Sequence, residues 1–154
     1  MSMVSMSVWY LSANPLSLLI VNVSFSVVTS NLYLAKFNAK MQHIQNRIKF
    51  VNSNIDKFCA GKYDLVISNP PYIKNYKISY LDDDVKLYEP KVALDGGIDG
   101  YSEIKNVVKK SSELIKTKGK LVIEIDDKQI SHTKEILKKN GFYINKIVKD
   151  LAKK

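Results

Sequence analysis

The feature that most constrains this chain is a short apolar run that stops at two consecutive prolines. Residues 65–67 (Leu-Val-Ile) are continuously apolar, which is typical of a strand covered on both faces of a sheet. Pro70 and Pro71 end the strand, because proline has no backbone N–H for a sheet and restricts the residue before it. Asn69 is therefore predicted at the carboxyl end of a central strand, where open α/β sheets place their ligands.

The tetrapeptide Asn69-Pro70-Pro71-Tyr72 indicates a particular chemistry. The side-chain oxygen of Asn69 and the carbonyl of Pro70 are two acceptors that can hold both N–H groups of a planar amino group. The nitrogen lone pair then faces an electrophile, and Tyr72 offers an aromatic face to the planar group. Such a loop positions a weak nucleophile and needs no strong base. The alternative is a plain turn, since Asn-Pro is a common turn dipeptide, but the buried strand before it favours a site.

Ser68-Asn-Pro-Pro-Tyr-Ile73 after a hydrophobic strand resembles motif IV of amino-methyltransferases that use S-adenosylmethionine. Within that class, more of the chain resembles the HemK-type release factor glutamine N5-methyltransferases. The resemblance covers residues 30–151, and its stretches come in the family's order with close to its spacing. They are residues 35–39, 46–48, 63–73, 88–100, 119–125 with Gln129, and 149–151.

This resemblance implies an α/β fold: a Rossmann-like class I methyltransferase sheet, mostly parallel and incomplete at both ends. The implied reaction moves a methyl group from S-adenosylmethionine to the side-chain amide nitrogen of a glutamine in a peptide chain release factor. Asn69 and Pro70 would orient that amide, Tyr72 would pack on it, and Pro71 would complete the substrate-binding loop. Asn69 would also border the cofactor, and no metal is implied.

A second cofactor position is implied after the strand expected around residues 48–51. In the family, an acidic or amide residue there contacts the adenine amino group, and a bulky neighbour lies against the ring. Asn54 and Ile55 occupy these positions. The alternative is that Ser53-Asn54 forms only a turn.

The first 35 residues contain neither a charged residue nor a glycine. In the family, a strand here ends in a Gly-rich loop, because a Cβ would block the approach of the cofactor to the backbone. The first glycine of this chain is Gly61. The position after the next strand, where the family has an acidic residue, falls on Ser26, and no acidic residue lies nearby. We expect that residues 1–28 are an aberrant segment from a truncated or frame-shifted gene. Residues 29–154 would then be the C-terminal part of the catalytic domain, without the family's N-terminal helical domain.

The apolar segment Val8–Val28 has two further interpretations. It is apolar enough to consider a membrane span, but Asn14 and Pro15 interrupt it and no basic region precedes it. Residues 16–23 and 25–28 could instead form buried strands, which are expected to be this apolar.

The remaining sequence predicts alternating helices and strands, which is typical of a mostly parallel sheet. Helices are expected at residues 29–42, 101–116 and 129–140, and strands at 48–51, 120–125 and 142–148. Gly119 would end the turn before a strand. Gly141 would cap the last helix.

Composition limits the partners. The net charge is +9, but only Arg47 among 24 basic residues is an arginine. Since arginine is the residue that bidentate base and phosphate recognition favours, we expect no specific nucleic-acid partner. Asp82-Asp83-Asp84 would be a solvated loop and Glu89 a structural carboxylate. The single cysteine, Cys59, fits a reducing compartment and hence a cytoplasmic protein, and no oligomer is expected.

Three rival functions stay open. An adenine-N6 DNA methyltransferase would use the same acceptors on a flipped-out base, but it predicts an Arg-rich groove. An inactive degenerate fragment is favoured by the missing glycine loop. The third is a small membrane-anchored protein, although we do not expect a membrane partner.

Overall fold

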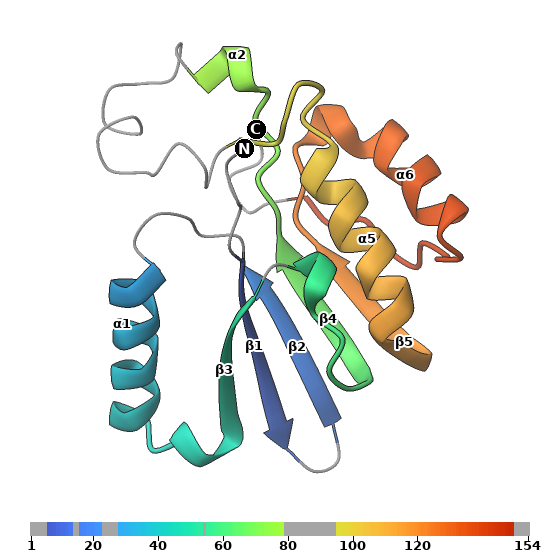
Figure 1. Ribbon diagram of the computed structural model, residues 1–154. Helices are drawn as coiled ribbons and strands as arrows, with labels where there is room; N and C mark the ends of the chain where they lie inside the picture. The colour runs from blue at the N-terminus through green and yellow to red at the C-terminus, as the bar shows by residue number, and fades with distance from the viewer. Residues whose placement is uncertain (1–5, 14–15, 23–27, 54, 79–94, 150–154) are drawn as a thin grey trace.

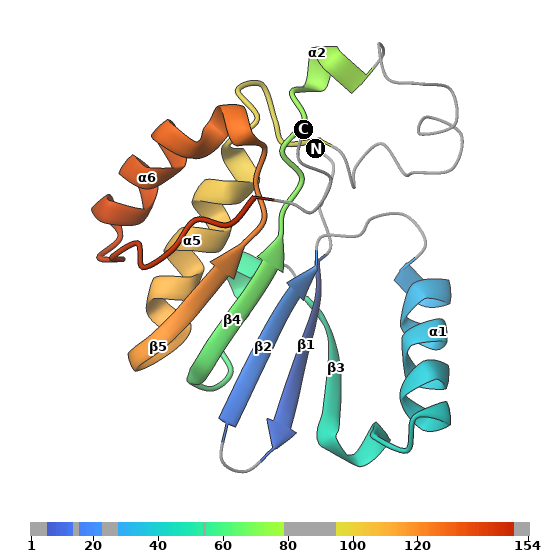
Figure 2. The same ribbon diagram turned by 180° about the vertical axis from the view of Figure 1, so that it is seen from behind.

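The computed structural model describes residues 6–13, 16–22, 28–53, 55–78 and 95–149. Their strands form a five-stranded sheet in the order β3-β1-β2-β4-β5. Helix α1 stands beside β3 at one end of the sheet, and α5 and α6 lie at the other end next to β4 and β5 (Figures 1 and 2). This alternation of helices and strands confirms the predicted α/β class.

Four of the five strands run in the same direction. β1 (Met6–Ala13) pairs antiparallel with both β2 (Leu16–Asn22) and β3 (Ile48–Ser53). β2 pairs parallel with β4 (Tyr63–Asn69), and β4 pairs parallel with β5 (Ile115–Ile123). The predicted parallel pairing is present from β2 through β4 to β5, whereas both pairings of β1 are antiparallel.

The apolar N-terminal segment enters the sheet. Of the strands expected at residues 16–23 and 25–28, the first is present as β2, and residues 23–27 lie outside the described part of the chain. Among the residues that the structure describes, no helix is both long and apolar enough to cross a membrane.

The helices agree with the prediction within a few residues. They are α1 (Val28–Met41), α5 (Ser102–Leu114) and α6 (Ile130–Lys139). Gly141 ends α6 as predicted, with a φ of +82°. Its N–H bonds to Lys138 and that of Phe142 to Leu137, a pairing that satisfies carbonyls left free at a helix end.

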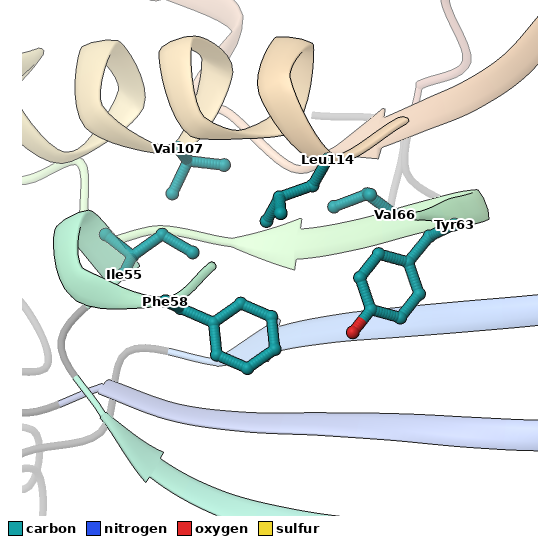
Figure 3. Packing of buried hydrophobic residues seen from close by; sticks show 6 residues of the cluster. All are labelled: Ile55, Phe58, Tyr63, Val66, Val107 and Leu114. Carbon is teal, nitrogen blue, oxygen red and sulfur yellow. The ribbon is translucent and has the colours of Figure 1, made fainter. Parts of the chain in front are cut away.

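The core lies between α5 and the sheet. Figure 3 shows one cluster, in which α5 and the short 3-10 helix η2 (Ile55–Lys57) pack onto β4. A second cluster joins Ile104 and Val108 of α5 to Ile136 of α6. Both clusters follow from the apolar spacing of α5, whose buried residues lie three or four positions apart. The first cluster comprises Ile55, Phe58, Tyr63, Val66, Val107 and Leu114.

The predicted turn at Gly119 is wrong in its placement. α5 ends at Leu114 and β5 begins at the next residue, so Gly119 lies within the strand. The pairing with β4 is irregular here, since Tyr63 opposes Ile115 while Leu65 opposes Lys120. A Cβ on Gly119 would lie 2.7 Å from the Ile115 side chain. The glycine thus marks an irregularity in the strand rather than its start.

The strand predicted at residues 142–148 is absent. These residues have no regular secondary structure, and Tyr143 is 95% exposed. The described sheet ends at β5, and residues 142–148 pair with no strand in it. Apolar and β-branched residues do not form a strand without a partner strand to pair with.

Candidate functional site

The site predicted from the sequence begins at the carboxyl end of β4. Asn69 is the last residue of this strand and is exposed. It lies opposite Asn22, the last residue of β2, in the parallel register. On the other side, Ser68 pairs with Ile123 at the end of β5. Asn69 is therefore presented between two parallel neighbours at the edge where such sheets bind ligands.

The two prolines after Asn69 anchor the loop. Pro70 and Pro71 are both buried, and Pro70 is among the fully buried side chains of the chain. Their rings fix φ and offer no backbone N–H. The exposed Asn69 side chain thus stands on a rigid, buried support, and the carbonyls of the loop face no backbone donor from these two residues.

A glycine-rich loop at residues 95–100 packs against the backbone of the site loop. Ile73 forms a parallel bridge with Asp95, and the Gly96 N–H donates to the Ile73 carbonyl at 2.7 Å. A Cβ on Gly96 would lie 2.9 Å from the Tyr72 backbone, and one on Gly100 would lie 2.9 Å from the Tyr72 carbonyl oxygen. The loop leads into α5 (Ser102–Leu114), the helix expected at residues 101–116. Its further role is this close backbone contact.

Gln129 connects the site loop to the end of β5. It is the last residue of the 3-10 helix η3 (Asp127–Gln129), and it is 6% exposed. Its Nε2 donates to the Gly100 carbonyl at 2.9 Å and to the Tyr72 carbonyl at 3.3 Å. Its Oε1 accepts from the Asp126 N–H at 3.4 Å. One side chain therefore joins its own turn, at Asp126, to two segments that are distant in sequence.

The resemblance includes Gln129, but sequence reasoning gave it no role in the site. A signal was available, because Asp126 and Gln129 have the spacing of a capping box. The structure contains this box: the Asp126 side chain accepts from the η3 backbone while Gln129 reaches back. The contacts of Gln129 with Tyr72 and Gly100 join distant segments, and no local pattern indicates them.

Tyr72 is partly buried, and its environment raises the pKa of its hydroxyl above the ordinary 10.0. Burial is the largest cause, followed by the negative charges of Glu124 and Asp126. The phenol is neutral at physiological pH, as a tyrosine of ordinary pKa also is, and it stays neutral to higher pH. It can pack against a planar group or donate one hydrogen bond, but it is a poor base.

The two cofactor positions after β3 stay predictions. Asn54 lies outside the described residues. Ile55 is 2% exposed and packs within the first core cluster. Its contact with an adenine ring stays a prediction. Glu89 and Asp82-Asp83-Asp84 also lie outside the described residues, and among those described no group of acidic, histidine or cysteine side chains could hold a metal ion.

The residues present do not fit the cofactor loop that the resemblance implies. A glycine cradle would have to follow a strand beside β4, and β2 ends there at Asn22. The next five residues of the sequence, Val-Ser-Phe-Ser-Val, all carry a Cβ. Near the site, the Tyr72 backbone already occupies the space beside Gly96 and Gly100 that a ligand would need.

Comparison with known proteins finds methyltransferases of similar sequence. No protein-family model matches the chain. A release factor glutamine methyltransferase of Clostridium acetobutylicum is 34% identical over 125 residues, which cover 78% of this chain and 43% of that protein. The enzyme of the same name from Fusobacterium nucleatum is 40% identical over 121 residues, or 76% and 33%. A bifunctional methyltransferase of Rickettsia felis is 30% identical over 130 residues, or 84% and 25%.

The chain thus spans less than half the length of these curated relatives. The matches agree with the resemblance that the motif Asn69-Pro70-Pro71-Tyr72 and its neighbouring stretches predict. The chain is a homologue of part of the release factor glutamine methyltransferases.

Proposed function

We propose that this chain carries the substrate loop of a release factor glutamine methyltransferase and holds a glutamine side-chain amide for methylation. The observation that carries the proposal is the placement of Asn69, exposed at the end of β4 on two buried prolines. The names of the relatives supply the substrate class.

The chemistry of the loop suits a primary amide. Such an amide has two N–H donors, and the Asn69 side-chain oxygen and the Pro70 carbonyl are acceptors of the required kind. The amide nitrogen is a weak nucleophile, so its rate depends on alignment with the methyl donor. Tyr72, held neutral, contributes a flat face and no competing negative charge.

The donor in this proposal is S-adenosylmethionine, which supplies an electrophilic methyl group when bound. The described residues do not offer its glycine cradle, so the contribution assigned to this chain is the binding and orientation of the substrate. We further propose that residues 1–28 stand in place of the family's glycine-loop segment. Sequencing the DNA upstream tests this: a Gly-x-Gly-x-Gly loop in another frame is expected, and its absence would refute it.

The test of the function is methyl transfer to a bacterial peptide chain release factor. Purified chain, release factor and S-adenosylmethionine labelled in the methyl group are incubated, and the release factor is analysed for methylated glutamine. If the wild-type chain transfers the methyl group, Asn69→Ala is expected to lower the rate by about a hundredfold, since misplacing a reactant by an ångström has such an effect. Asn75→Ala, which changes an exposed asparagine of the short helix α2 (Asn75–Ile78), is the matched control.

Calorimetry separates the possible results. Titration with S-adenosylmethionine alone tests the donor site, and titration with the release factor alone tests the substrate loop. Release factor that binds wild type and the Asn75→Ala variant, but not the Asn69→Ala variant, would support the proposal even without transfer.

The rival functions predict other results. Methylation of DNA adenine in place of the release factor would support the rival DNA methyltransferase. Binding of neither ligand by a folded chain would support the inactive fragment.

A further inference from the structure

The side chain of Gln129 is placed where it can control the site loop. It is 6% exposed, and its amide group has contacts on both its nitrogen and its oxygen. A buried amide that lost these partners would leave polar groups unsatisfied, which is unfavourable. The orientation of the Gln129 amide is therefore fixed by the three backbone groups around it.

The two acceptors of the Gln129 nitrogen belong to the two loops that meet at the site. The Tyr72 carbonyl is in the loop that follows Asn69, and the Gly100 carbonyl ends the glycine-rich loop. No N–H of Pro70 or Pro71 can hold this loop, because proline has none. A side-chain donor from another segment is thus one of the means by which the loop is held in register.

The third contact holds the Gln129 side chain against the turn that follows β5. Gln129 Oε1 accepts from the Asp126 N–H, three residues after the end of β5. The Asp126 carboxylate in turn caps η3 by accepting from the Lys128 N–H at 2.8 Å. β5 pairs directly with β4, and the Glu124 N–H donates to the Ser68 carbonyl next to Asn69. The turn that carries Gln129 is therefore fastened to the strand that carries Asn69.

We propose that Gln129 is a positioning residue: by holding the Tyr72 and Gly100 carbonyls together, its amide sets the conformation of the loop that presents Asn69 and Pro70. The consequence for methyl transfer rests on the proposed function, whereas the effect on the loop does not. A residue that only stabilises the fold would change the free energy of unfolding and leave the folded loop unchanged. A positioning residue changes the loop in molecules that are fully folded.

The test is nuclear magnetic resonance of the folded chain, read at the Asn69 side-chain amide and the Tyr72 ring. Gln129→Glu keeps the size of the side chain but replaces the donor with a carboxylate, which repels both carbonyls when ionised. We expect both resonances to be displaced by more than a line width at pH 8. They should return towards the wild-type positions as the pH falls and Glu at position 129 takes up a proton, because the protonated acid can again donate. In the Gln129→Met variant, whose side chain cannot donate a hydrogen bond, the Asn69 and Tyr72 resonances should be displaced at every pH.

The matched control is Asn140→Asp at the other end of α6. Asn140 also donates a side-chain amide to a backbone carbonyl, that of Ile136, at 2.8 Å, but it contacts neither loop in the described structure. Its replacement should leave the Asn69 and Tyr72 resonances in place. Gln129 variants that are folded and retain the wild-type resonances would overturn the proposal.

A further measurement uses the wild-type chain alone, so it applies even if the Gln129 variants do not fold. In the wild-type chain, the side-chain amide protons of Gln129 should exchange with solvent much more slowly than those of exposed Asn69. Equal exchange rates would also overturn the proposal. None of these measurements needs the methyl donor or the release factor, so a failure of methyl transfer does not decide the role of Gln129.

Discussion

Gly96 lies so close to Tyr72 that a Cβ on Gly96 would be 2.9 Å from both the Cα and the carbonyl carbon of Tyr72. These are backbone atoms, so they cannot move aside as the tip of a flexible side chain would. The glycine-rich loop therefore serves to let two backbones touch beside the site. A loop that bound phosphate with its backbone would leave these positions open to the ligand.

Gly96→Ala should consequently destabilise the chain by about 1–3 kcal/mol, the usual range for forcing an extra carbon into a packed site. Gly141→Ala is the matched control. Gly141 ends α6, where a Cβ would meet no atom within 4 Å, and only its φ of +82° opposes alanine. That strain costs about 1 kcal/mol. Urea unfolding followed by far-ultraviolet circular dichroism measures both, and a smaller loss for Gly96→Ala than for Gly141→Ala would contradict the steric argument.

Local patterns predicted most of the elements around the site. The apolar run before Asn69 gave β4, and the spacing of apolar residues gave α5 and α6. β1 (Met6–Ala13) was not among the expected strands. Its direction could not be predicted either, because an apolar strand has the same composition whichever way it runs. The absent strand at residues 142–148 is a related case, since strand formation depends on a neighbour that the segment itself does not specify.

The candidate site was predicted only in part for the same reason. Asn69 to Tyr72 are contiguous, so their placement followed from one strand and its end. Gln129 and Tyr72 are 57 residues apart, and their hydrogen bond depends on how β4 and β5 pair. Such a contact is a property of the tertiary structure.

The raised pKa of Tyr72 predicts a dependence of stability on alkaline pH. The unfolded chain releases this proton near pH 10.0, whereas the folded chain holds it to higher pH because of burial, Glu124 and Asp126. The contribution of Tyr72 to stability is thus complete below pH 10.0 and is lost as the pH rises through the folded pKa. Tyr72→Phe should show a shallower loss of unfolding free energy between about pH 9 and pH 11.

Ultraviolet titration checks the cause. The difference between wild-type and Tyr72→Phe absorbance near the tyrosinate band isolates the ionisation of this one phenol. Glu124→Gln should lower the midpoint of that difference, since one of the two negative charges is removed. A Tyr72 midpoint at or below 10.0 in the wild-type chain would refute the assignment.

Replacing Thr133 on α6 with valine should make the chain more stable than the wild type. The side chain is 1% exposed, and its Oγ1 has no hydrogen-bond partner among the described residues. A buried hydroxyl without a partner costs about 1–3 kcal/mol, and valine has nearly the same shape without the oxygen. Thr133→Val should therefore raise the unfolding free energy by about 1 kcal/mol. Thr133→Ser, which keeps the hydroxyl and leaves a cavity, should lower it, and a loss of stability for valine would imply an unseen partner.

Glu103 near the start of α5 presents two opposing effects whose balance depends on pH. Burial, Asp56 and Asp95 raise the pKa of its carboxyl above 4.5, with burial the largest cause, although Asn106 donates a weak hydrogen bond at 3.5 Å that acts the other way. A negative charge in the first turn of a helix is favourable by about 0.3–1 kcal/mol. Because the balance raises the pKa, ionised Glu103 destabilises the fold. The stability that goes with the neutral carboxyl is complete below pH 4.5 and is lost as the pH rises through the folded pKa. Glu103→Gln should therefore be more stable than wild type at pH 7, and the two chains should converge below pH 4.5, where both side chains are neutral. Urea unfolding across this range measures the difference. Glu113→Gln, on the exposed side of α5, should show the opposite trend, because Lys110 donates to the Glu113 carboxylate at 2.8 Å and lowers its pKa. If the Glu103→Gln variant is instead less stable at pH 7, the helix dipole outweighs burial at this position.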